Sequence, residues 1–192
     1  MKLGIPGVPF THNGSKSVKS ASNNSRRADI IKKFVGMTRH EIMNLRTIDI
    51  GSENMIGRLV GTRRNTVGDL NTRCIGFEDG TYDFVLNSEI IEHIMNPLGV
   101  MQDIYRMLKP GGICVVATPI QPRIGAWYDL DKHFVEYRPW RLKQLFLYCG
   151  FEVIKYRRYS IWKWFPFAFT GIRPLMRCLF HRSQMWLIRK PY

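Results

Sequence analysis

Short apolar runs that alternate with helical patterns constrain the fold of this chain more than any other feature. Residues 47–50, 82–87 and 113–118 are rich in β-branched and aromatic side chains, which is typical of buried strands. Between the last two runs, residues 97–108 repeat apolar side chains at helical spacing and begin with a proline, which suits a first helical turn. Alternating strands and helices predict an α/β fold, with a mostly parallel sheet and helices on both faces.

The same alternation continues toward the C-terminus. We expect a helix over residues 139–148, followed by strands over 151–156 and 184–189. The segment between residues 53 and 70 is weaker and predicts only a short helix and a short strand. The LKPGG string at residues 108–112 is expected to end the preceding helix, because proline cannot continue a helix and glycine turns freely.

The N-terminal segment has a different composition. Residues 11–27 are rich in Ser, Asn and Lys and have too few apolar groups to offset their own ordering entropy. A helical pattern starts at Asp29 and continues loosely to Leu45. We therefore predict a flexible basic tail over residues 1–27 and a single domain over residues 28–192, which is enough chain for one hydrophobic core.

The charge of the chain is concentrated at its two ends. The 192 residues contain 29 Lys and Arg against 15 Asp and Glu, a formal net charge of +14. Residues 46–150 carry twelve basic and twelve acidic side chains, so the excess lies in the first 45 and the last 42 residues. Such ends attract phosphates, nucleic acid or an anionic membrane, although a solvated basic surface explains the charge equally well.

Cysteine use and hydropathy indicate a cytoplasmic protein. The four cysteines lie far apart without a CxxC pair, so they predict neither a disulfide framework nor a zinc ribbon. The apolar run at the start is too short for a signal peptide, and residues 161–180 contain three basic residues and two prolines. We expect no membrane-spanning helix.

Five short motifs occur in a fixed order along the chain. They are IDIG at 48–51, YDFVLNSEIIEH at 82–93, LKPGG at 108–112, TP at 118–119 and GFEV at 150–153. In this order and spacing, residues 46–190 resemble a class I S-adenosylmethionine-dependent methyltransferase of the small-molecule type 11 kind. The resemblance implies a Rossmann-like methyltransferase fold and S-adenosylmethionine as the cofactor.

The resemblance implies a cofactor site at the carboxyl ends of the strands, where ligands bind in open α/β sheets. The first strand and its turn would contribute Asp49, Gly51, Ser52 and Glu53, with glycine allowing close approach of the backbone. Further along, Asp69 and Leu70 would lie at the ribose or adenine, and Asn87 and Ser88 would face the transferred methyl group. Asp69 follows Asp49 by twenty residues, the spacing of the ribose-binding carboxylate in dinucleotide folds; alternatively, it caps a turn.

Two departures from the family pattern favour a second interpretation. The glycine-rich loop has one glycine, Gly51, where the family has two or three, and Glu53 could repel the methionine carboxylate. Only 34 residues separate Asp49 from Asp83, so we expect one β–α unit fewer than usual. The alternative is therefore a degenerate, non-catalytic methyltransferase-like protein that binds a ligand or serves as a scaffold.

The acceptor side of the site is assigned to His93 and His133. A histidine can remove a proton near neutral pH during methyl transfer. We expect the two imidazoles to approach each other across the mouth of the site, although His93 could instead only pack at its turn. The set Glu89, Glu92, His93 and His133 also resembles the metal ligands of small-RNA 2′-O-methyltransferases, but we assign no metal to this chain.

The expected partner is a small-molecule or carrier-linked acceptor, methylated on oxygen or nitrogen. Residues 155–182 interleave basic and aromatic side chains. We expect them to form one face that favours an anionic acceptor or an anionic membrane surface. An RNA acceptor is a weaker prediction, because the aromatic residues lack the spacing of known RNA-binding modules. The sequence leaves the oligomeric state and the identity of the acceptor open.

Overall fold

A single five-stranded sheet forms the centre of the molecule. The computed structural model describes residues 18–51, 55–66, 70–71, 77–120, 134–160 and 183–192. Its strands lie in the order β1-β2-β3-β5-β4. Their bounds are Thr47–Asp49 for β1, Tyr82–Ser88 for β2, Leu108–Pro119 for β3, Glu152–Tyr159 for β4 and Ser183–Arg189 for β5.

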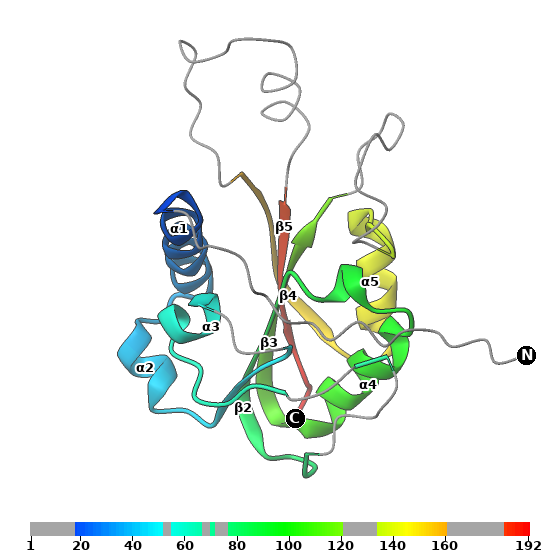
Figure 1. The fold of residues 1–192 in the computed structure, drawn as a ribbon. Helices are drawn as coiled ribbons and strands as arrows, with labels where there is room; N and C mark the ends of the chain where they lie inside the picture. The colour runs from blue at the N-terminus through cyan, green and yellow to red at the C-terminus, as the bar shows by residue number, and fades with distance from the viewer. Residues whose placement is uncertain (1–17, 52–54, 67–69, 72–76, 121–133, 161–182) are drawn as a thin grey trace, which may run out of the picture.

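Helices cover both faces of this sheet, as predicted (Figure 1). One face carries α1, α2 and α3, and the other carries α4 and α5. A short 3-10 helix, η1, follows β2. The bounds are Val18–Val35 for α1, Arg39–Met43 for α2, Met55–Val60 for α3, Ile91–His93 for η1, Pro97–Met107 for α4 and Pro139–Tyr148 for α5.

The central strands supply side chains to two separate hydrophobic clusters. Successive residues of a strand point to opposite faces. On β2, Phe84 and Leu86 pack with α1 and α3, whereas Val85 packs with α4 and α5. All three side chains are fully buried. This explains why the sequence of β2 is a continuous apolar run and not an alternating one.

The sheet is mixed, which refines the prediction of a mostly parallel one. Strands β1, β2 and β3 are parallel. Strand β5 is antiparallel to both of its neighbours, β3 and β4. The crossover through α5 places β4 parallel to β3 with a gap between them, and β5 fills this gap from the opposite direction. Two parallel strands need a long crossover connection such as α5, whereas an antiparallel strand such as β5 can follow its neighbour without one.

Two element boundaries differ from those predicted. Helix α1 begins at Val18, so residues 18–27 are helical and do not belong to the predicted flexible tail. Strand β3 begins at Leu108, so the LKPGG string lies within it. It is held there by the end of the chain: Gly111 donates to the carbonyl of Lys190, and Lys190 donates to the carbonyl of Gly112, both at 2.9 Å.

Residues 67–69 of the predicted strand over residues 65–70 lie outside the described residues. Asn65 forms an isolated parallel bridge with Asp49. This bridge places residues 65–66 beside β1, on the side opposite β2.

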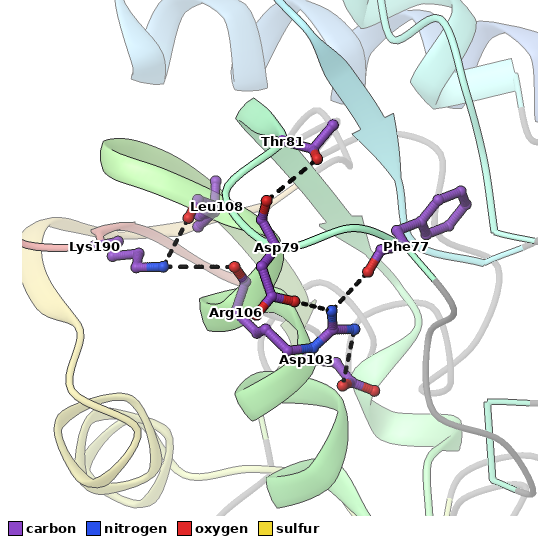
Figure 2. A network of polar contacts seen from close by, with 7 residues as sticks. All are labelled: Phe77, Asp79, Thr81, Asp103, Arg106, Leu108 and Lys190. Carbon is purple, nitrogen blue, oxygen red and sulfur yellow. Dashed lines mark hydrogen bonds and ion pairs between the residues drawn. The ribbon is translucent and has the colours of Figure 1, made fainter.

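A polar network fixes the amino edge of the sheet, at the end opposite the carboxyl ends of β1, β2 and β3 (Figure 2). The guanidinium of Arg106, on α4, donates to the carbonyl of Phe77 at 2.6 Å and pairs with Asp79 and Asp103. The ammonium of Lys190 donates to the carbonyl of Leu108 at 2.8 Å. The network ties α4 and the last residues of the chain to the start of β2.

A tight contact between α3 and β1 generates a prediction about stability. A Cβ added at Gly57 would lie 2.2 Å from Oδ2 of Asp49 and 2.7 Å from Oγ1 of Thr62. We expect Gly57→Ala to lower the free energy of unfolding by about 1–2 kcal/mol, because overpacking outweighs the gain in helix propensity. Urea denaturation measures this effect. Met55→Ala on the same helix is the control, and an equal loss in both variants would contradict the contact.

Candidate functional site

The carboxyl ends of β1, β2 and β3 meet at one edge of the sheet because the three strands are parallel. After β2 the chain turns sharply at Glu89, whose φ of 58° lies in the left-handed region that non-glycine residues rarely adopt. Helix η1 follows immediately. The turn places Ile91 and Glu92 in fully buried positions.

Glu92 joins three segments at this edge. Its Oε2 accepts a hydrogen bond of 2.8 Å from the hydroxyl of Thr118, near the end of β3. Its backbone carbonyl accepts from the N–H groups of Phe134 and Val135, which lead toward α5. The other carboxyl oxygen, Oε1, is buried without a hydrogen-bond partner among the described residues.

The environment of Glu92 keeps its carboxyl group protonated near neutral pH. Burial and the nearby Glu89 carboxylate raise the pKa of Glu92 to about 8, although the hydrogen bond from Thr118 and the charge of Arg27 act in the opposite direction. A protonated carboxyl group can donate a hydrogen bond as well as accept one. Strongly raised carboxyl pKa values are a common property of functional sites.

Two more buried polar groups lie on the same face of the sheet. Neither Oδ1 nor Nδ2 of Asn87, at the end of β2, has a partner in the parts of the chain that the structure covers. The hydroxyl of Tyr137 is also buried and unpaired there, and burial together with the charge of Glu92 raises the pKa of Tyr137 to about 12. Native proteins pair most of their buried polar groups, so such a cluster indicates a ligand or ordered water.

A fully bonded neighbour shows that this face can satisfy its polar groups. Gln184 on β5 is fully buried; its amide nitrogen donates to the carbonyl of Tyr137 at 2.7 Å, and its oxygen accepts from the indole of Trp186. A parallel bridge between Ile120 and Tyr137 adds to the support. The backbone of Tyr137 is therefore fixed, while its hydroxyl is left available.

The face toward α1 carries an ion pair at the same edge. Arg27, on α1, lies 3.2 Å from the carboxylate of Glu89, and both side chains are mostly buried. Tyr159, at the end of β4, is close enough for the charge of Glu89 to contribute to the raised pKa of its hydroxyl, of which burial is the main cause. The pair secures the first helix to the end of β2.

The turn after β1 is closed by its own neighbours. The N–H of Gly51 donates to the hydroxyl of Thr66 at 2.6 Å, and this hydroxyl donates to the carbonyl of Gly51 at 3.2 Å. Gly51 has a φ of 114°, and a Cβ placed on it would lie 2.6 Å from Cδ1 of Ile90. Glycine is therefore required here by both its backbone conformation and its packing.

Of the other predicted cofactor residues, Asp49 and Ser88 lie at the expected edge, on the face toward α1 and α3. Asp49 is buried, and its carboxylate packs against Gly57 of α3. Ser88 ends β2 with a buried hydroxyl that has no hydrogen-bond partner among the described residues. Leu70 packs against the core cluster beneath α4 and α5. The remaining predicted cofactor residues, Ser52, Glu53 and Asp69, lie outside the described residues.

Only one of the two predicted catalytic histidines lies in the described part of the chain. His93 ends η1 and is half-buried. Its carbonyl accepts from the side-chain amide of Asn71, whose oxygen accepts from the N–H of Met95 at 2.6 Å. His133 lies outside the described residues, so the predicted approach of the two imidazoles stays a prediction. No group of three or more metal-ligating side chains is present among the described residues.

Several residues of this edge were not predicted from the sequence. Arg27 was assigned to the tail, and Thr66 and Tyr137 carried no motif of their own. Each acquires its place through a contact with a residue far away in the sequence. Thr118 and Glu92 lie within motifs, but their hydrogen bond could not be read from the spacing.

Known proteins share both the sequence pattern and the fold of this chain. A model of the methyltransferase domain matches residues 23–156, most of the chain. The chain belongs to the methyltransferase domain family. Among curated proteins, the ubiquinone biosynthesis O-methyltransferase of Parvibaculum lavamentivorans is 45% identical over 38 residues, which cover 20% of this chain and 15% of that protein. The malonyl-[acyl-carrier protein] O-methyltransferase of a Marinomonas species is 38% identical over 58 residues, covering 28% and 22%.

The chain therefore spans only a small part of the length of these curated methyltransferases. A solved structure extends the likeness at the level of the fold. The 1,6-didemethyltoxoflavin-N1-methyltransferase of Burkholderia thailandensis, with its substrate and S-adenosylhomocysteine bound, superposes with a TM-score of 0.62 at 14% identity. The superposition covers 92% of this chain and 82% of that one.

The buried Glu92 generates a prediction about pH. Its pKa of about 8 in the folded state exceeds the ordinary value of 4.5, so between these pH values the folded state holds a proton that the unfolded state has released. Glu92 therefore destabilises the fold progressively as the pH rises through this range. Glu92→Gln should become more stable relative to the wild type by about 1 kcal/mol or more between pH 5 and pH 8.

Urea denaturation at several pH values measures this difference. Glu78→Gln, at an exposed position, is the control and should show no such trend. A stability difference between Glu92→Gln and the wild type that stays constant with pH would mean that Glu92 is ionised in the fold.

Proposed function

We propose that this methyltransferase domain binds S-adenosylmethionine at the carboxyl edge of β1 and β2 and catalyses methyl transfer to an oxygen or nitrogen of a small or carrier-linked acceptor. The observation that carries the proposal is the buried amide of Asn87, unpaired within the described part of the chain and placed where α/β folds bind their ligands. Membership of the family and the names of its relatives support the reaction class.

The residues at this edge suit such a cofactor in their chemistry. Asn87 offers both a donor and an acceptor, and Ser88 adds a hydroxyl. Asp69, by the resemblance, would bind the ribose. When bound, S-adenosylmethionine supplies an electrophilic methyl group on a sulfonium. The work left to the chain is to bind and align the reactants, to exclude water and to accept a proton.

We assign two different roles toward the acceptor, one to a base that accepts its proton and one to a hydrogen-bond donor. His93 ends η1 beside this edge and is half-buried. We assign it the role of the base because an imidazole can accept a proton near neutral pH; His133 is proposed for the same role from the sequence alone. Glu92, protonated near neutral pH, can instead donate a hydrogen bond to an oxygen of the acceptor, with the Tyr137 hydroxyl beside it. We favour an acceptor with a hydroxyl or carbonyl group for this reason.

A specific observation favours the non-catalytic alternative. The N–H of Gly51 is already bonded to Thr66, and Ile90 packs directly against Gly51. The amide that the family pattern would offer to a ligand is therefore occupied within the chain. In a protein that keeps the fold but no longer binds the cofactor, the amide of Gly51 would be free to bond within the chain, as it does here. Such a protein would have no need of an unpaired amide at Asn87.

Calorimetric titration of the full chain with S-adenosylmethionine and S-adenosylhomocysteine separates the two functions. We expect saturable binding of both compounds by the wild type. Asn87→Ala should weaken binding by about 1–3 kcal/mol, the usual effect of losing a buried hydrogen-bonding partner. The same variant should lower the melting temperature less than the loss of a hydrogen-bonded side chain would, because the Asn87 amide has no partner among the described residues.

Asn44→Ala, at an exposed amide after α2, is the matched control. Absence of binding by the wild type would support the non-catalytic alternative. Binding that Asn87→Ala leaves intact would place the cofactor elsewhere.

A further inference from the structure

Helix α5 carries large apolar side chains on its outer side as well as on its inner side. Leu142 and Phe146 are fully buried in the core beneath it. On the outside, Trp140, Leu147 and Tyr148 are 52%, 53% and 77% exposed. Large apolar side chains that gather on an exposed surface mark an interaction site, so the outer side of α5 indicates a partner.

The exposed residues of α5 form an ordered stripe. Residues three, four and seven positions apart lie on one side of a helix, so Trp140, Gln144 and Leu147 follow one line, with Tyr148 beside it. At helical spacing Lys143 flanks this line on one side and Arg141 on the other. The guanidinium of Arg141 lies 5.4 Å from the centre of the Trp140 ring. The helix contains no acidic residue.

The same character continues onto the neighbouring edge strand, β4. Beneath the surface, buried rings link the two elements: Phe146 packs on Trp186 at 5.6 Å between ring centres, and Trp186 packs on Tyr156 of β4 at 4.2 Å. Tyr156 is 37% exposed, and its hydroxyl accepts from Nε of the exposed Arg158. We call Trp140, Arg141, Lys143, Leu147, Tyr148, Tyr156 and Arg158 the α5 surface.

The composition of the α5 surface indicates which kind of partner covers it. Trp and Tyr prefer the interface of a bilayer, and Lys and Arg beside them attract anionic headgroups. A second copy of the chain would bring these cations against one another. A protein partner or nucleic acid with matching acidic groups would satisfy the charges, but would give the exposed Trp and Leu side chains no apolar environment as extensive as lipid.

We propose that the α5 surface docks the protein on an anionic lipid bilayer, with Trp140 and Leu147 inserted at the headgroup boundary and the flanking cations on the phosphates. None of the helices that the structure describes is long and apolar enough to cross a bilayer, so this contact is peripheral. The inference does not depend on the proposed methyl transfer. It rests on α5 together with Tyr156 and Arg158, the part of the basic segment 155–182 that contributes to this surface; residues 161–182 lie outside the described residues.

Sedimentation of the full chain with lipid vesicles tests the proposal. The wild type should bind phosphatidylcholine vesicles that contain phosphatidylserine, bind pure phosphatidylcholine weakly, and be released by added salt. Two variants, Trp140→Ser with Leu147→Ser and Arg141→Ser with Lys143→Ser, should each lower the partition coefficient by about tenfold or more. All four side chains are partly or largely solvent-exposed, so thermal melting should show both variants folded.

Met95→Ser and Arg64→Ser, at exposed positions outside the α5 surface, are the matched controls and should bind as the wild type does. Three results would overturn the proposal. The wild type could fail to bind anionic vesicles, or the α5 variants could bind as well as the wild type, which would assign binding to the basic ends. Sedimentation equilibrium could also reveal a dimer that Trp140→Ser with Leu147→Ser abolishes, which would identify a second copy as the occupant.

Discussion

The hydrogen bond between Thr118 and Glu92 is the contact on which the arrangement of the site depends. It holds η1 over the end of β3, and the backbone carbonyl of the same glutamate anchors the chain that leads to α5. A carboxyl group in this environment is kept protonated by burial and by Glu89. Folding therefore forces a polar group into the core at the sheet edge where open α/β folds bind ligands, at a cost that an apolar residue would avoid.

The opposite edge of the sheet has a different design. There Arg106, Asp79, Asp103 and Lys190 satisfy one another and nearby carbonyls, and they bind α4 and the end of the chain to the sheet (Figure 2). At the carboxyl edge, Asn87, Glu92 and Tyr137 retain polar atoms with no partner among the described residues. The paired groups of the amino edge stabilise the fold, whereas the carboxyl edge retains polar groups that a ligand could bind. This division is expected of a domain that binds a ligand.

The sequence predicts correctly those elements whose buried side chains repeat at a regular spacing. It fails for elements whose bounds depend on contacts with residues distant in the sequence. Strand β2 and helices α4 and α5 were predicted almost to their bounds, because their apolar periodicity matches their environment. The start of α1 was missed because residues 18–27 are polar; their helix is supported downstream by Ile31 and Phe34 in the core and by Arg27 on Glu89. The LKPGG string ends α4, as predicted, but its pairing with Lys190 makes it the irregular first part of β3, which the sequence did not predict.

The site shows the same limit. Motifs located the end of β2, including Asn87 and Ser88, because strand ends follow from the pattern. They could not reveal that Thr66 occupies the amide of Gly51 or that Tyr137 is presented by Gln184, since both depend on contacts between segments distant in sequence.

Hydrogen exchange of the full chain, measured by mass spectrometry with and without S-adenosylhomocysteine, tests the central claim most directly. If the carboxyl edge around Asn87 and Glu92 is the ligand site, the compound should slow exchange in peptides that cover the end of β2 and η1, and leave the network around Arg106 unchanged. Binding that slows exchange only in other segments, or no change at any concentration of the compound, would contradict the account.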